Sequence, residues 1–393
     1  MRILVNSAIT TMGGGVQKSV EFVRASMAEN RGHQFFYVLS EAVARNLEGV
    51  VRVDPSAHVV VSHKPSHPIR GRATRTMLRE TERRFAPDAV YTVFGPTYTT
   101  FRAPHLLGFA VPWITHPNRW AWDTIRHPLA RARFWAWCRY VTFWTQFADH
   151  WVLETEVAAD GLARVLGVSR ERMHVVPNVP GALYEGGASM NGALPGTEKR
   201  DAADYNVLVF SHWYPHKNLE ILPAVAAHTR RMDPSRRYRF FLTFDRSLPA
   251  WANIHEEARR LGVEEQVTNL GPVLVHDGPR LYASSDAVFL PTVLEVYTAT
   301  YPEAMACRKP IVTTDLPFAR DICGDAALYA GPNDAEASAR RLVDLAGDAK
   351  LQDELVRRGT ERLRRAKTRQ ETFHMVIDAL EQTVRSRASG RER

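Results

Sequence analysis

Two glutamates, Glu295 and Glu303, stand eight positions apart in the last third of the chain, just after a short apolar segment at 286–290. The stretch that holds Glu303 has Pro302 at what looks like the first turn of a helix, where proline is favoured. A loop that enters a helix presents backbone N–H groups at the positive end of the helix dipole, where a diphosphate can be held. Each carboxylate can accept hydrogen bonds from two hydroxyl groups. The spacing therefore predicts a site for a ligand that combines a diphosphate with the vicinal hydroxyls of a hexose and a ribose.

A simpler interpretation of the same pair stays open. In it, Glu295 is a surface residue and Glu303 is an acid that interacts favourably with a helix N-terminus.

A basic motif, S-H-W-Y-P-H-K-N, follows the strand expected at 207–211. Its lysine, Lys217, is expected to neutralise a diphosphate leaving group as a point charge. His212 or His216 is expected to add a second positive charge when protonated, which predicts a pH-dependent affinity for the ligand. The alternative is that Lys217 is a solvated loop residue.

Two further motifs follow strands of the first half. The first strand runs into T-T-M-G-G-G-V-Q, where Gly14 and Gly15 are expected to let backbone N–H groups approach an anion closely. The spacing is not that of the dinucleotide-binding fingerprint, and a plain tight turn is the alternative. His116 follows the strand expected at 106–110 and is either a structural histidine or a residue of the site.

Strand-like and helix-like segments alternate in two series, which predicts an α/β protein with largely parallel sheets covered by helices on both faces. The first series has strands at 2–6, 35–39, 58–61, 89–93, 106–110, 151–153 and 174–176, with helices at 17–29, 70–85, 130–147 and 156–166. The second has strands at 207–211, 240–243, 267–270, 287–290 and 311–313. Ligands of such sheets bind beyond the carboxyl ends of the strands, so Ser211, Pro291 and Thr314 are expected to border one cleft.

The glutamate segment resembles the nucleotide-binding signature of retaining glycosyltransferases of family 4 (group 1), which have Glu, seven residues, then Glu-Ala-Met-Ala. Three more stretches carry the resemblance, L-G-P-V at 270–273, L-Y-A-S-S-D at 281–286 and K-P-I-V-T-T-D at 309–315. The resemblance implies the glycosyltransferase B fold, with two Rossmann-like domains and the active site in the cleft between them. The sequence differs from the family at the donor site. The residues between the two glutamates usually include Gly-Phe-Gly, and here Val296-Tyr297-Thr298 stand in that place.

The resemblance also implies roles for individual residues. Glu295 is expected beside the transferred sugar and Glu303 on the ribose, with Lys217 on the diphosphate and His116 facing the reacting sugar. The arginine that family members place shortly before the lysine is missing here. The expected catalytic residues are His116, Glu295 and Lys217, and the expected donor-binding residues are Gly14, Gly15, Ser211, His216, Lys217, Tyr297, Thr298 and Glu303.

A chain of 393 residues with 45% hydrophobic content can bury two cores. We expect an N-terminal acceptor domain at 1–180, a linker at 181–204 and a nucleotide-sugar donor domain at 205–370. A helix at 371–385 is expected to pack back on the first domain, followed by a frayed basic tail at 386–393.

The composition restricts the partners. The net charge of +8 suits an anionic partner, but the basic residues are dispersed and no nucleic-acid motif is present. Three cysteines without pairing spacing, and an N-terminus too polar for a secretory signal, favour a cytoplasmic location. No Asp-x-Asp sequence is present to hold a divalent cation on a diphosphate, so neither a metal nor another cofactor is expected.

The segment 126–151 combines arginines with many aromatic residues. This suits the interface of an anionic bilayer, which would place the protein peripherally at the inner face of the membrane and favour a polyprenyl-linked acceptor. The alternative is a core helix, since apolar residues surround it on most sides.

Three functions are compatible with these features. The first is a metal-independent retaining glycosyltransferase that moves a hexose from a nucleotide-diphosphate sugar to a saccharide or lipid-linked saccharide in bacterial cell-surface polysaccharide synthesis. The second is a sugar-nucleotide epimerase or another enzyme with the same two-domain fold. The third is a non-catalytic scaffold that binds nucleotide sugars.

Overall fold

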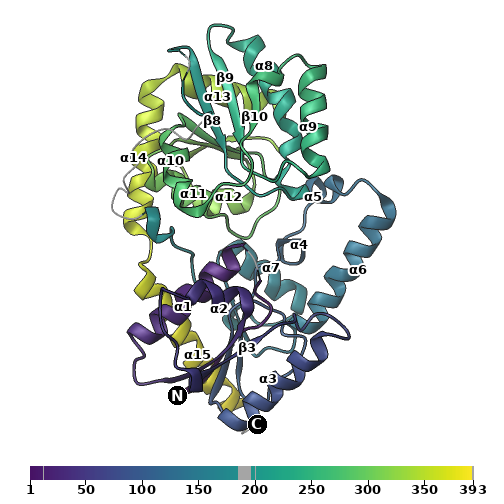
Figure 1. Cartoon of the computed structure of the whole chain (residues 1–393), viewed down its shortest axis with the longest axis vertical. Helices are drawn as coiled ribbons and strands as arrows, with labels where there is room; N and C mark the ends of the chain where they lie inside the picture. The colour runs from purple at the N-terminus through teal and green to yellow at the C-terminus, as the bar shows by residue number, and fades with distance from the viewer. Residues whose placement is uncertain (12, 185–195, 200, 392–393) are drawn as a thin grey trace. The chain divides into compact units, whose positions relative to one another are not determined.

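The computed structural model describes residues 1–11, 13–184, 196–199 and 201–391 (Figure 1). Its contacts divide the chain into two units. The first unit comprises Met1–His116, Ala132–Pro177 and Lys367–Arg393, and the second comprises Pro117–Arg131 and Asn178–Ala366. Each unit holds one parallel sheet with helices around it, so the predicted α/β fold with two Rossmann-like domains is confirmed.

The first unit is built on a seven-stranded sheet in the order β3-β2-β1-β4-β5-β6-β7, parallel throughout. Three of its strands, β4, β5 and β6, are buried along their whole length, as expected of a parallel sheet covered on both faces. Its strands are β1 (Arg2–Ser7), β2 (Gln34–Ser40), β3 (His58–Val61), β4 (Ala89–Thr92), β5 (His105–Gly108), β6 (His150–Leu153) and β7 (Met173–Val175). All seven were predicted within one or two residues.

Helices connect these strands, and their ends follow ordinary capping chemistry. Ser40 and Thr155 each accept a hydrogen bond from the backbone N–H three residues further on, which starts α2 and α7. Gly167, in the left-handed region, ends α7. The helices before β7 in the chain are α1 (Gly13–Ala28), α2 (Glu41–Leu47), α3 (Gly71–Phe85), α4 (Pro112–Thr115), α5 (Arg119–Thr124), α6 (Pro128–Thr145) and α7 (Glu156–Leu166). Of these, α5 and the first residues of α6 belong to the second unit.

The second unit is built on a six-stranded parallel sheet in the order β10-β9-β8-β11-β12-β13. Its strands are β8 (Asp204–Val209), β9 (Arg237–Leu242), β10 (Val267–Asn269), β11 (Ala287–Leu290), β12 (Ile311–Thr314) and β13 (Ala327–Ala330). Its helices are α8 (Leu222–Met232), α9 (Pro249–Arg260), α10 (Gly278–Ala283), α11 (Thr300–Ala306), α12 (Pro317–Cys323), α13 (Ala335–Gly347) and α14 (Ala349–Arg365). The edge strand β13 was not predicted.

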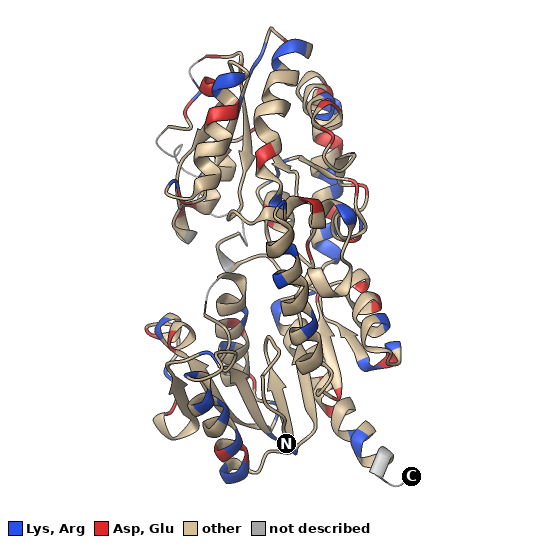
Figure 2. Ribbon diagram, turned by 90° about the vertical axis from the view of Figure 1, so that its right-hand side faces the viewer, with Lys and Arg blue, Asp and Glu red and all other residues tan. Residues whose placement is uncertain are grey.

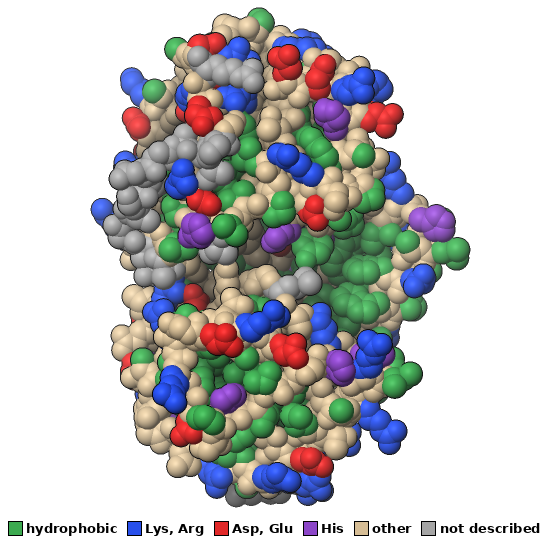
Figure 3. All heavy atoms as spheres, viewed as in Figure 1, with side chains coloured by type: hydrophobic (Ala, Val, Ile, Leu, Met, Phe, Trp, Pro, Cys, Tyr) green, Lys and Arg blue, Asp and Glu red, His purple; other side chains and the backbone are tan. Residues whose placement is uncertain are grey.

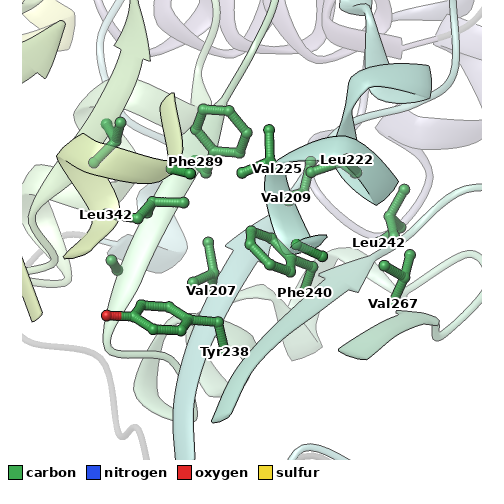
Figure 4. Close-up of a cluster of buried hydrophobic side chains, with 14 of the residues drawn as sticks. Val207, Val209, Leu222, Val225, Tyr238, Phe240, Leu242, Val267, Phe289 and Leu342 are labelled. Carbon is green, nitrogen blue, oxygen red and sulfur yellow. The ribbon is translucent and has the colours of Figure 1, made fainter. Parts of the chain in front are cut away.

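The core of the second unit fixes the strands that carry its loops. Side chains from one face of β8, β9 and β11 pack against α8 and α13 (Figure 4). Phe240 on β9 and Phe289 on β11 are almost fully buried there, and Leu342 of α13 closes the cluster. Burying side chains of this size stabilises the unit by roughly 2 kcal/mol each, so the neighbouring strands β8 and β11 form a firm base for the loops at their carboxyl ends.

The last helix, α15 (Arg369–Arg391), packs on the first unit against β4, β5 and β6, with Ile377 and Leu380 in that core. It extends through the segment expected as a frayed tail, which is helical as far as residue 391. Arg387 anchors this end by donating to Asp149 at 2.7 Å. Half of the expected linker, residues 185–195 and 200, lies outside the described residues. None of the described helices has the length and apolarity of a membrane span.

Candidate functional site

The candidate site is built at the point where the strand order of the second sheet reverses. β8 and β11 are neighbours there, although α8, β9, α9, β10 and α10 separate them in the sequence. After β8 the chain enters a short 3₁₀ turn at Pro215–Lys217, and after β11 it forms a loop at 291–299 that leads into α11. In open parallel sheets the two segments that leave such a point diverge, and ligands bind between them.

The turn that carries Lys217 is tied to the loop after β11. Asn218 adopts the left-handed conformation (φ 56°), and its side chain donates to the carbonyl of Pro291 at 3.2 Å. The carbonyl of His216 accepts from the backbone N–H of Val293 at 2.9 Å and from the hydroxyl of Thr292 at 3.1 Å. These bonds hold the Lys217 turn directly beside the Glu295 loop.

Lys217 and Glu295 form an ion pair through Nζ and Oε1. Only 15% of the lysine side chain and 10% of the glutamate side chain are exposed. The hydroxyl of Thr292 donates to the same carboxylate oxygen at 3.3 Å. The simpler interpretations of these two residues are therefore wrong, because Glu295 is not a surface residue and Lys217 is not a solvated loop residue. The part that concerns Glu303 is correct, since Glu303 lies in the first turn of a helix.

Glu303 lies in the first turn of α11, as the Pro302 pattern predicted. Its carboxylate accepts hydrogen bonds from the hydroxyl of Tyr282 at 3.0 Å and from Tyr184. Burial raises the pKa of Glu303 to about 7, although both tyrosine hydrogen bonds act in the opposite direction. The carboxyl group therefore keeps its proton to a higher pH than an ordinary glutamate does.

Tyr184 reaches Glu303 from the 3₁₀ turn Ala182–Tyr184, and its ring packs edge-on against Tyr282 with 5.7 Å between the centroids. The hydroxyl of Thr300 at the start of α11 donates to the carbonyl of Phe210 at 3.0 Å, which fixes the helix against the end of β8. Sequence reasoning missed Tyr184, since a single tyrosine in a glycine-rich stretch carries no spacing signal.

His216 does not supply a second cation in this arrangement. Burial, with a smaller contribution from the charge of Lys217, lowers the pKa of its imidazole to about 4, although Glu295 acts in the opposite direction. The ring stacks on Tyr214 with 5.6 Å between the centroids. The imidazole is neutral near pH 7, so the expectation of a positive charge at this position is not supported.

The other predicted donor-binding residues of this unit lie around the same loops. The hydroxyl of Tyr297 donates to the carbonyl of Asn178 at 3.1 Å, and Thr298 is buried. Ser211 follows β8 and donates to the carbonyl of His212 at 2.8 Å. Pro291 and Thr314 belong to the carboxyl ends of β11 and β12, the same edge of the sheet.

Asn118 is a residue of this site that the sequence did not single out. Its amide donates to the carbonyl of Val293 at 2.7 Å, and its side-chain oxygen accepts from Ala121 N at 2.9 Å as the cap of α5. The segment Pro117–Arg131 consequently belongs to the second unit, although it interrupts the sequence of the first. A sequence pattern could reveal the cap, but not the bond to a loop some 175 residues away.

The remaining predicted residues belong to the first unit. Gly14 and Gly15 lie in the first turn of α1 rather than in a loop before it. A Cβ on Gly15 would come within 3.0 Å of the side chain of Thr10, so glycine permits close packing there. His116 caps α4, and its ring nitrogen Nδ1 lies 2.7 Å from the hydroxyl of Thr115. Their predicted roles stay predictions.

Two family models match the chain, and together they cover both units. Residues 13–179 match the model described as Glycosyltransferase Family 4, and residues 204–348 match the model described as Glycosyl transferases group 1. With its paired glutamates and its two Rossmann-like units, the chain belongs to the family 4 (group 1) glycosyltransferases, which have the glycosyltransferase B fold.

Curated relatives match parts of the chain. The O-antigen chain mannosyltransferase RfbU of Salmonella typhimurium is 24% identical over 178 residues, which is 45% of this chain and 45% of RfbU. The O-antigen chain mannosyltransferase B of Escherichia coli is 36% identical over 87 residues, or 22% of this chain and 23% of that protein. The chain thus spans less than half the length of these curated relatives.

Solved structures match nearly the whole chain at low identity. A glycosyltransferase from Rickettsia africae superposes with a TM-score of 0.72 and 14% identity, covering 98% of both chains. HepE of Anabaena, solved with UDP and glucose, gives a TM-score of 0.70 and 16% identity over 97% of this chain and 99% of HepE. WaaG, a glycosyltransferase of lipopolysaccharide biosynthesis, gives a TM-score of 0.66 and 14% identity over 96% of this chain and 99% of WaaG. At these identities the likeness concerns the fold.

Proposed function

We propose that the chain is a retaining glycosyltransferase that transfers a hexose from a nucleotide-diphosphate sugar to a saccharide or polyprenyl-linked saccharide. The observation that carries the proposal is the buried pair of Lys217 and Glu295, held beside the strand-order reversal in the same unit as Glu303. A cation and two carboxylates on loops at one sheet edge match the charges and hydroxyls of a sugar nucleotide.

The pair suggests how the donor is bound. The diphosphate of the donor supplies an anion for the Lys217 ammonium, and the hydroxyls of the hexose supply hydrogen-bond donors for Glu295. Each group thus exchanges one partner for another when the ligand binds, so neither buried charge is left unpaired. Glu303 accepts from the ribose hydroxyls in its ionised form, beside the hydroxyls of Tyr282 and Tyr184.

The proposed reaction breaks the bond between the anomeric carbon and the diphosphate oxygen and forms a bond to the acceptor oxygen on the same face of the sugar. The acceptor proton passes to the departing phosphate oxygen. Lys217 stabilises the charge that develops on the diphosphate, and this kind of stabilisation contributes about 10²–10³ in rate per group. His116, in the first unit, is proposed to face the reacting sugar, as the family resemblance implies.

The transfer is proposed to need no metal ion, because Lys217 supplies positive charge for the leaving diphosphate. Among the described residues no three His, Cys, Asp or Glu side chains are grouped as a metal site. The three cysteines are buried free thiols, which is compatible with a reducing, cytoplasmic compartment. This location would give the enzyme access to nucleotide sugars.

The relatives suggest the pathway class. Two are O-antigen chain mannosyltransferases, and structural neighbours were solved with UDP or a UDP-sugar. We therefore propose a role in bacterial cell-surface polysaccharide synthesis, with an activated hexose as the donor.

The proposal is tested by incubating the full chain with GDP-, UDP- and dTDP-hexoses and lipid-linked or free saccharide acceptors, followed by separation of the products. Acceptor-dependent release of a nucleoside diphosphate, with an added hexose in the same anomeric configuration as the donor, is the expected result. Conversion of the donor sugar without acceptor would indicate the epimerase alternative. Tight donor binding without any turnover for every acceptor class would indicate the scaffold.

A further inference from the structure

Helix α6 of the first unit exposes an unusual number of aromatic side chains. Among the described residues six Phe, Tyr and Trp side chains are exposed, and five of them fall between positions 135 and 147. Their exposed fractions are 58% for Trp135, 42% for Trp137, 47% for Tyr140, 51% for Phe143 and 42% for Phe147. A soluble protein rarely leaves such a cluster in water without a partner for it.

The exposed aromatic residues of the helix lie on the sides that do not face the core. Tyr140 and Phe143 are three positions apart, which is the spacing of one helical face, and Phe147 lies in the turn just after the helix. Cys138, Val141 and Thr145 follow the i, i+3, i+7 spacing of another face and are buried in the first unit. Thus α6 has a core face and a separate exposed face, and the core-helix interpretation accounts for only one of them.

The exposed rings pack against neighbouring rings. Tyr140 stacks on Tyr98 with 5.6 Å between the ring centroids, and Phe143 contacts Phe147 edge-on at 5.2 Å. Figure 3 shows hydrophobic side chains gathered into a continuous area in the region of α6. The rings therefore form one supported apolar surface rather than several mobile side chains.

The charged residues within this segment all have one sign. Residues 126–147 contain four arginines and no aspartate or glutamate. Arg131 pairs with Asp123 at 3.2 Å, whereas Arg133 and Arg139 are exposed and have no acidic partner in the part of the chain that the structure describes. In Figure 2, where α6 faces the viewer, the blue colour of Lys and Arg recurs along this helix.

We propose that this face of α6 docks on an anionic phospholipid bilayer, with the aromatic rings in the interface and Arg133 and Arg139 at the lipid phosphates. Tyrosine and tryptophan have an apolar body and a polar tip, which suits the depth of the headgroups. Arginine binds phosphate oxygens with two N–H groups at once. The helix lies along the membrane surface, because its opposite face is fixed in the core of the first unit.

The choice of a bilayer over a second copy of the chain follows from the charge. A two-fold interface between copies of this face would bring together two segments whose charged residues are all arginines, and like charges at an interface are unfavourable. An anionic lipid surface complements them, and each basic residue near such a surface strengthens binding appreciably.

The proposal is tested with the full chain and sedimentable vesicles of phosphatidylcholine, with or without phosphatidylglycerol. The chain should bind the anionic vesicles, and its tryptophan emission should shift to the blue and be quenched by brominated lipid. A variant with Tyr140→Ser and Phe143→Ser, and another with Arg133→Gln and Arg139→Gln, should each bind on the order of tenfold more weakly.

Ile69→Ser and Arg164→Gln are the matched controls, since both residues are exposed in the first unit and neither belongs to α6. They should bind vesicles as the unchanged chain does. Binding that is equal on neutral vesicles, or unaffected by both α6 variants, would overturn the proposal. Concentration-dependent self-association that only the Tyr140/Phe143 variant abolishes would overturn it in favour of a dimer. Docking requires no turnover, so it is decided separately from the transfer reaction.

Discussion

The hydroxyl of Tyr184 lies 2.1 Å from the position that a Cβ atom on Gly278 would occupy. Tyr184 can therefore reach the carboxylate of Glu303 only because position 278, at the start of α10, has no side chain. Two residues far apart in sequence thus jointly position the glutamate that we propose to bind the ribose.

Tyr184→Phe should weaken the binding of the nucleoside diphosphate by about tenfold, because a hydrogen bond to a charged group is worth roughly 1.5–3 kcal/mol. Isothermal titration calorimetry with the free nucleoside diphosphate measures this directly. Tyr205→Phe is the control, since the Tyr205 hydroxyl is buried in the same unit without a hydrogen-bond partner in the described structure. Equal affinities for the unchanged chain and Tyr184→Phe would show that the hydroxyl does not position Glu303.

The affinity for the nucleotide should rise as the pH is raised through 7. The pKa of Glu303 is raised to about 7 by burial, and only the ionised carboxyl accepts two ribose hydroxyls. Glu303→Gln should remove this dependence, which titrations between about pH 6 and 8 would show. A pH profile that is unchanged in Glu303→Gln would assign the effect to another group.

As the pH rises, the stability of the ligand-free protein should fall, whereas the affinity for the nucleotide should rise. The pKa of Glu303 is higher in the folded than in the unfolded chain, so the folded state holds more protons between pH 4.5 and about 7. The free energy of unfolding should therefore fall across this range by on the order of 2 kcal/mol, relative to Glu303→Gln. Urea unfolding of both proteins at several pH values tests the sign.

Gly161→Ala should displace the turn of α4 that positions His116. A Cβ on Gly161 of α7 would lie 1.9 Å from the carbonyl oxygen of Thr115, a backbone atom that cannot move aside cheaply. Overpacking of this kind costs about 1–3 kcal/mol, and it would displace the turn that His116 caps. Thermal unfolding should show the loss, and the turnover number should fall more than donor affinity does. Gly347→Ala, where a Cβ meets nothing within 4 Å, is the control.

The strands and the paired glutamates could be predicted because their signals are local. Apolar runs such as 287–290 are nearly continuous in a parallel sheet, and Pro302 marked the start of α11. The edge strand β13 is also a short apolar run, but it was not predicted, and it is only partly buried.

The contacts that complete the site depend on the fold itself. The bond from Asn118 to Val293 and that from Tyr184 to Glu303 join residues far apart in the sequence. The low pKa of His216 follows from burial, which the motif around Lys217 does not encode. These contacts and this burial arise only when the loops of the second unit are folded.

Chelation should leave the transfer activity intact, because Lys217 supplies positive charge to the diphosphate. Initial rates measured with and without EDTA should agree within about twofold, allowing for the change in ionic screening. Complete loss that only an added divalent cation restores would refute a metal-independent reaction.

Replacement of Lys217 tests the central claim most directly. In Lys217→Met, kcat/KM for acceptor-dependent release of the nucleoside diphosphate should fall by about 10²–10³, because the charge on the leaving group loses its partner. Lys199→Met is the control, since Lys199 pairs with Asp286 at 2.8 Å in the same unit and is more exposed. The account predicts a large loss for Lys217→Met and none for Lys199→Met. Turnover by folded Lys217→Met at the rate of the unchanged chain would contradict it.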